Sequence, residues 1–212
     1  MSRSPVLWFV LFLLAALLLA GLAPLERTLG ANARLVYFHG AWVWTALASF
    51  LAAAVCGLVG LLLREKPQLP GTKPGWHAWS RALGRTGLFF WVTFLPMSLV
   101  VMQANWNGLY LDEPRFRVPL NFAIVGLLLQ IGLSFLPDVR WTSLANIGYA
   151  IALLVGMSGA QAILHPESPI FNSNARDIQL YFLGLNLLLL ASGWQMARWW
   201  LAIQNRSTAS PA

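Results

Sequence analysis

The sequence predicts an all-α integral membrane protein, a six-transmembrane-helix bundle with both termini on the inner side (N-in and C-in). Three observations lead to this prediction. Of the 212 residues, 58% are hydrophobic and only 10% are charged, whereas a soluble domain carries about a quarter charged residues. The apolar residues form long runs, and a run of about 20 crosses the hydrocarbon core as a helix. The charged residues are confined to short islands between these runs.

Six apolar runs define the expected spans, and together they make residues 1–212 a single transmembrane domain. The first resembles a signal peptide, but it is longer than a usual signal segment and Pro24 would follow the cleavage site, so we interpret it as a retained helix. Pro96 predicts a kink in the third run. The runs cover residues 5–24, 35–63, 87–104, 118–136, 141–163 and 178–203.

The orientation follows from the distribution of lysine and arginine, which concentrate on the cytoplasmic side of membrane proteins. An inner N-terminus places nine of the 14 basic residues inside and five outside. The inner set is Arg3, Arg64, Lys66, Lys73, Arg81, Arg85, Arg140, Arg198 and Arg206. The outer set is Arg27, Arg34, Arg115, Arg117 and Arg176. The segment 64–85, with its three prolines, is expected to be an extended inner loop.

Composition also excludes several other classes of protein. The net charge of +7 does not come from one continuous basic stripe, so nucleic acid is not an expected partner. The single cysteine, Cys56, lies inside an apolar run and forms no disulfide or zinc-binding pattern. Most of the 11 tryptophans lie in or near the spans, and we interpret most of them as anchors at the membrane interface. No ATP-binding motif is present.

Two of the three histidines are expected at the same outer surface. His39 lies in Tyr37-Phe38-His39-Gly40-Ala41-Trp42, near the start of the second run, and His165 follows the fifth run. Neutral imidazole is a ligand of haem iron, and a six-coordinate haem takes one histidine on each face. The alternative is that both are ordinary hydrogen-bonded residues at the interface. A zinc site is less attractive, because no cysteine completes a tetrahedral set. His77 is expected to be an interfacial residue of the inner loop.

The outer loop 105–117 joins aromatic, acidic and basic residues. Aromatic rings can lie against a porphyrin, and arginine pairs with carboxylates such as haem propionates. The alternative is an ordinary interfacial loop held by its own Asp/Glu–Arg pairs. The residues concerned are Trp106, Tyr110, Asp112, Glu113, Arg115 and Arg117.

The order of these three elements resembles the cytochrome c assembly protein family, whose members handle haem in cytochrome c maturation. The likeness is to the six-helix haem-delivery (haem exporter) proteins of that family. Tyr37-Phe38-His39 followed by small residues and Trp42 is similar to the first histidine motif, and Leu164-His165 is similar to the second. In the tryptophan-rich outer loop of that family, Trp106, Tyr110, Glu113 and Arg115 match, whereas Leu109 and Asp112 stand at tryptophan positions.

The resemblance implies that His39 and His165 are the axial ligands of a b-type haem, cradled by Trp106, Tyr110 and Arg115. The protein would hold haem at the outer, periplasmic side of a bacterial-type inner (plasma) membrane and present it to a haem chaperone or apocytochrome. It would be no enzyme. Its partners would be haem, membrane lipid and other cytochrome c maturation subunits, with an ATP-binding transporter among them.

Two other functions remain open on the sequence alone. A bis-histidine electron-transfer membrane cytochrome would also bind haem, but usually with the histidines deeper in the bundle. A cofactor-free permease or scaffold subunit would use both histidines only as interfacial residues.

Overall fold

The chain folds into six helices in a computed structural model that describes residues 4–65, 73–160, 170 and 174–209, the last five of them as backbone alone. Helix makes up 82% of the described residues, which contain no strand. The helices are α1 (Pro5–Gly21), α2 (Ala33–Leu62), α3 (Trp76–Trp106), α4 (Pro114–Ser134), α5 (Val139–Gly159) and α6 (Arg176–Ala209). The prediction of an all-α bundle is therefore confirmed.

Five of the described helices, α2 to α6, are long and apolar enough to cross a membrane. The exception is α1, which is apolar but has only 17 residues. At 1.5 Å per residue it reaches about 26 Å, a little less than the roughly 30 Å of a hydrocarbon core. A multi-pass membrane protein is thus supported, while a sixth span formed by α1 stays a prediction.

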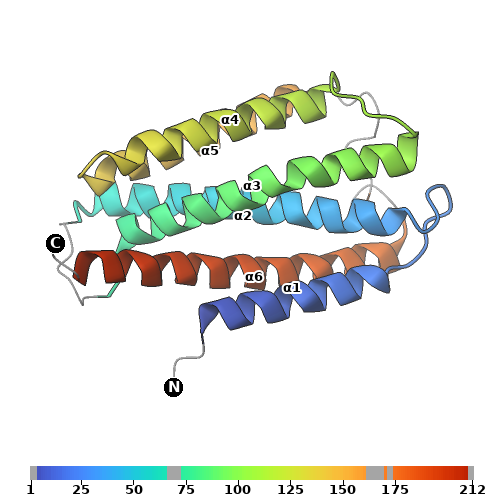
Figure 1. Ribbon diagram of the computed structural model, residues 1–212, viewed down its shortest axis with the longest axis horizontal. Helices are drawn as coiled ribbons and strands as arrows, with labels where there is room; N and C mark the ends of the chain where they lie inside the picture. Colours follow the sequence, from blue (N-terminus) through green and yellow to red (C-terminus); the bar gives the residue numbers. More distant parts are fainter. Residues whose placement is uncertain (1–3, 66–72, 161–169, 171–173, 210–212) are drawn as a thin grey trace.

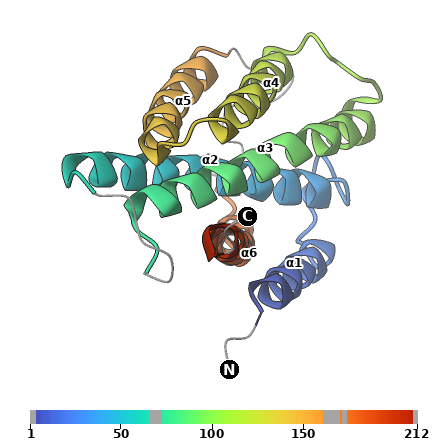
Figure 2. The same ribbon diagram turned by 60° about the vertical axis from the view of Figure 1, so that its left-hand side comes forward.

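The helices form three layers, with α2 and α3 in the middle (Figures 1 and 2). Helices α4 and α5 cover one side of this pair, and α1 and α6 cover the other. Successive helices run in opposite directions, so the connections gather at two ends. We call the end where α2 begins the His39 end, and the end where α2 finishes the Arg64 end.

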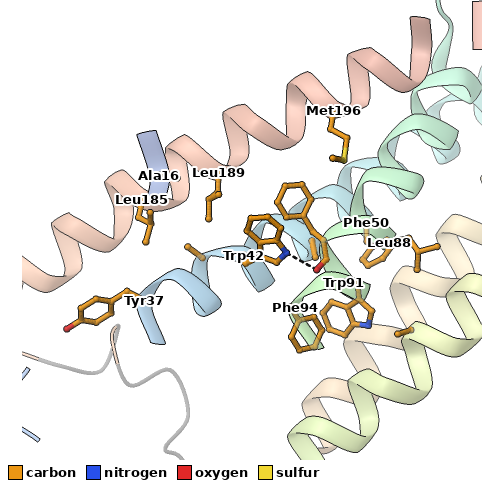
Figure 3. Packing of buried hydrophobic residues seen from close by; sticks show 14 of the residues in the cluster. Ala16, Tyr37, Trp42, Phe50, Leu88, Trp91, Phe94, Leu185, Leu189 and Met196 are labelled. Carbon is orange, nitrogen blue, oxygen red and sulfur yellow. Dashed lines mark hydrogen bonds between the residues drawn. The ribbon is translucent and has the colours of Figure 1, made fainter. Parts of the chain in front are cut away.

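The core between the layers is aromatic (Figure 3). Trp42 and Trp91 are 6% and 0% exposed, so the interpretation of tryptophans as interface anchors is wrong for these two. Both can be buried because each indole N–H has a partner: Trp42 Nε1 donates to the Phe90 carbonyl oxygen at 3.1 Å, and Trp91 Nε1 to that of Pro119 at 3.1 Å. The two tryptophans therefore tie α2 to α3 and α3 to α4.

The largest departure from the expected boundaries is the start of α3. The sequence predicts an extended loop over 64–85 and a span from 87, but α3 already begins at Trp76. Arginines did not stop the helix, because a long side chain can pack its stem on an apolar surface and keep its charge at the boundary. The Arg85 guanidinium, for example, lies 5.4 Å from the ring centroid of Trp200. Likewise, α4 begins at Pro114, so Arg115 and Arg117 are helical rather than part of a loop.

Candidate functional site

His39 lies on the face of α2 that is directed toward α3 and α5. Its half-buried ring stands 5.7 Å from the ring of Phe94 on α3, centroid to centroid. Phe50 lies three helical turns further along the same face, and its ring contacts Tyr149 on α5 at 4.9 Å. The imidazole is therefore carried by a helix and packs on α3, close to the His39 end.

His165 lies outside the described residues, so the predicted pairing of the two histidines stays a prediction. The described residues on either side of it show where the segment containing His165 joins the bundle. Ala160, directly after α5, is 6% exposed. Ile170 packs against the hydrophobic core, and its carbonyl oxygen accepts a hydrogen bond from Gln179 Nε2 at 3.5 Å. Because α5 ends and α6 begins at the His39 end, the chain enters and leaves the histidine segment at that end.

The connection between α3 and α4 also lies at the His39 end. Trp106 is the last residue of α3, and Asn107 ends the helix in a left-handed conformation with φ of 50°. Asn32, just before α2, donates through Nδ2 to the Ala104 carbonyl oxygen at 2.8 Å. This bond holds the start of α2 beside the end of α3, so Trp106 and its loop lie at the same end of α2 as His39.

Much of this connection is held by its own contacts. The Tyr110 hydroxyl donates to the Trp106 carbonyl oxygen at 3.3 Å, and Arg117 pairs with Asp112 at 3.4 Å. The Arg117 and Asp112 side chains are 63% and 98% exposed, so their ion pair contributes little stability. Glu113 is buried and precedes α4, whereas Arg115 is half-buried in the first turn of α4. The Arg117–Asp112 pair matches the alternative of an ordinary interfacial loop, whereas the hydrogen bond between Tyr110 and Trp106 brings two of the predicted haem-contacting residues together.

A haem fits these residues better than a compact metal centre does. Within the described residues, no group of three or more His, Cys, Asp or Glu side chains is placed to hold a metal ion. A haem needs only one protein ligand on each face of the ring, because the macrocycle supplies the other donors. His39 offers one imidazole beside an aromatic ring, and half-buried Arg115 offers a cation for a carboxylate. The second axial ligand would have to come from the segment that contains His165.

The sequence interpretation of His77 is wrong. It is not a loop residue at the interface but part of α3, with 5% of its surface exposed. Its Nδ1 lies 2.7 Å from the Ser143 hydroxyl of α5, and its backbone N–H donates to Glu65 Oε2 at 3.1 Å. The imidazole packs directly on Gly60, where an added Cβ would lie 2.9 Å from the ring. His77 thus joins three helices at the Arg64 end.

A buried polar cluster continues from His77 into the bundle. Asn146 on α5 donates through Nδ2 to the carbonyl oxygen and the hydroxyl of Ser80, at 2.9 and 3.0 Å. Gln130 on α4 donates to Asn146 Oδ1 at 3.4 Å. A cavity of about 10 Å³, enough for one water molecule, adjoins both amides. This cluster was not predicted from the sequence. The signal that could have found it is a set of small residues on α2 and α3, which let helices approach closely: Gly57, Gly60, Ser80, Gly84 and Gly87.

Comparison with known proteins adds no family: the sequence matches no protein-family model and no curated protein. What the structure defines is a class, a bundle of apolar helices with the architecture of a multi-pass membrane protein. Its two ends differ in chemistry. One carries His39, Trp106 and Arg115, and the other carries the His77 cluster.

Proposed function

We propose that this protein is a haem-binding membrane protein that holds haem at the His39 end and presents it to a haem chaperone or apocytochrome during cytochrome c assembly. The observation that supports this most is the position of His39. Its imidazole is half-buried and packs on Phe94 of α3, at the end where the chain enters and leaves the segment containing His165.

In this proposal, each part of the site has one task. His39 and His165 would ligate the haem iron, and Phe94 keeps the His39 imidazole in place by ring contact. Arg115 would pair with a propionate, and Trp106 and Tyr110 would pack against the porphyrin. The haem itself, once bound, supplies the iron that the two imidazoles ligate. Because the site is close to one end, haem can be released to a partner without crossing the bundle.

The proposed orientation is N-in and C-in, in a bacterial-type inner membrane. The basic residues support it, since the helix ends and connections at the Arg64 end carry the larger set. This orientation places the His39 end on the outer, periplasmic side, where a haem chaperone is available.

An absorption spectrum of the detergent-purified protein tests haem binding. We expect a Soret band that is lost in His39→Ala and in His165→Ala but retained in His77→Ala. His77 is the matched control, because it is a histidine of the same bundle whose Nδ1 is engaged with Ser143 at the opposite end. Equal haem content in all three variants and the wild type would refute ligation by His39 and His165.

Transfer separates delivery from electron transfer. Haem that passes from the purified protein to an added apo-chaperone supports the delivery proposal. Haem that stays bound while it is reversibly reduced and reoxidised supports an electron-transfer cytochrome instead. Absence of haem from protein reconstituted with excess haem would favour the cofactor-free alternative.

A further inference from the structure

The Arg64 end contains a basic cavity that the proposed haem function does not use. It has a volume of about 250 Å³ and lies between the end of α2 and the start of α5. Its described lining is Gly60, Leu61, Arg64 and Arg140. Two arginines thus line one hollow, one just after the end of α2 and the other in the first turn of α5.

Arg64 occupies a backbone conformation that arginine seldom adopts. Its φ is 50°, in the left-handed region where a helix commonly ends on glycine. The turn is fixed by hydrogen bonds from Arg64 N to the Leu61 carbonyl oxygen at 3.1 Å and from Glu65 N to that of Gly60 at 3.0 Å. A strained residue that is not glycine suggests that its side chain has a use. Here that side chain lines the cavity.

Arg140 reaches the cavity from the first turn of α5. Asp138 caps this helix, accepting a hydrogen bond from the Arg140 backbone N–H at 2.9 Å. Throughout the described part of the chain, neither the Arg64 nor the Arg140 guanidinium has an ion-pair partner, and both side chains are exposed. Their charge is therefore available to a ligand.

The surroundings of the cavity are polar on one side and apolar on the other. Behind Gly60 lies the buried ring of His77, whose Nε2 has no hydrogen-bond partner among the described residues. Next in sequence to the lining residues, Leu62, Leu63 and Trp141 are 72%, 66% and 56% exposed. Exposed indoles and leucines near helix ends are typical of the boundary between acyl chains and headgroups.

We propose that Arg64 and Arg140 bind a phosphate group in this cavity. Guanidinium groups match the geometry of phosphate oxygens, and two of them from separate segments of the chain can hold one phosphate from both sides. The adjoining apolar surface favours the headgroup phosphate of an anionic phospholipid, with its acyl chains along Leu62 and Trp141. Free phosphate has the same recognition chemistry without the apolar part.

The test measures binding to the delipidated full-length protein by isothermal titration. The probes are a short-chain phosphatidylglycerol, the matching phosphatidylcholine and inorganic phosphate. A basic residue near a membrane surface contributes about 1 kcal/mol, or about fivefold in affinity. We therefore expect Arg64→Gln and Arg140→Gln each to weaken phosphatidylglycerol binding about fivefold, and the double variant about 25-fold. Arg198→Gln, an exposed arginine of α6 that does not line the cavity, is the control and should bind as the wild type does.

Arg64→Gly separates binding from folding, because glycine relieves the left-handed strain. We expect it to lose affinity as Arg64→Gln does while unfolding at the same or a higher temperature. If phosphatidylglycerol binds more tightly than phosphatidylcholine and inorganic phosphate, the ligand is the headgroup of an anionic lipid. If inorganic phosphate binds as tightly as phosphatidylglycerol, the ligand is free phosphate. Unchanged affinity in the double variant, or equal loss in Arg198→Gln, would overturn the proposal.

Discussion

The contact between α3 and α5 at Gly84 allows the sharpest test of the packing. A Cβ added at Gly84 would lie 2.7 Å from Asn146 Oδ1 and 2.8 Å from Nδ2, closer than real Cβ contacts come. The amide cannot easily move aside, because it is hydrogen-bonded to Ser80 and Gln130. A Cβ at Gly148, on α5, would meet nothing within 4 Å. The two glycines therefore form a matched pair.

The expected free energies of unfolding have opposite signs. Gly84→Ala should destabilise the protein, because overpacking costs about 1–3 kcal/mol and displacing two of the three interhelical hydrogen bonds of Asn146 costs about 0.6 kcal/mol each. Against this, alanine stabilises a helix by about 0.8–1 kcal/mol relative to glycine. The net destabilisation is about 1–3 kcal/mol. Gly148→Ala has only the gain in helix propensity and should stabilise the protein by up to about 1 kcal/mol.

The assay is unfolding in mixed micelles followed by circular dichroism, with Asn146→Ala as a second-site variant. Removing the obstructing amide should make Gly84→Ala less costly in the Asn146→Ala background, which gives a coupling energy of about 1 kcal/mol or more. Two results would contradict the close approach of α3 and α5 at this point. One is equal stability of the Gly84→Ala and Gly148→Ala proteins, and the other is a double variant whose loss of stability equals the sum of those of Gly84→Ala and Asn146→Ala.

Two other predictions concern the connections. In a Cys56→Ser background, Thr28→Cys should react with an impermeant thiol reagent added outside intact cells and Lys73→Cys should not; the reverse pattern would invert the proposed orientation. In the connection between α1 and α2, backbone N–H groups of Leu29 and Thr28 lower the pKa of Glu26 from its ordinary 4.5. The turn is therefore fully stabilised above that value and loses this contribution as the pH falls through the lower folded-state pKa. Hydrogen exchange should show amide protection at 28 and 29 falling in acid in the wild type, but independent of pH in Glu26→Gln.

The helices were predictable because burial in a membrane demands long apolar runs, which are visible in the sequence itself. The start of α3 was not predictable in this way, because the charged residues before residue 87 were interpreted as a loop. In the structure, residues 76–86 combine buried small side chains such as Ser80 and Ala82 with the half-buried Arg81 and Arg85. An island of charge can therefore be one face of a helix that extends beyond the apolar run.

Of the two candidate sites, one was predicted from the sequence and the other was not. The location of His39 near one end followed from counting spans, and the structure places it near the start of α2. The His77 cluster depends on which helices are neighbours: Ser80 and Asn146, like His77 and Ser143, are 66 residues apart. Nothing local in the sequence specifies that α3 packs on α5 with these residues facing each other. The small residues around them are a local sign of close helix contact, which the sequence interpretation did not use.

The two ends can be tested independently because an aromatic layer separates them. Phe50 contacts Trp91 at 6.2 Å and Tyr149 at 4.9 Å, in the middle of the bundle. His39 and Gly60 are separated by about 30 Å along α2, at 1.5 Å per residue, and effects of mutations more than about 10 Å apart usually add. His39→Ala should thus leave phosphate affinity unchanged, and the Arg64 and Arg140 variants should leave haem content unchanged. If a single substitution abolished both, the cause would be loss of the fold, and neither proposal would gain support from it.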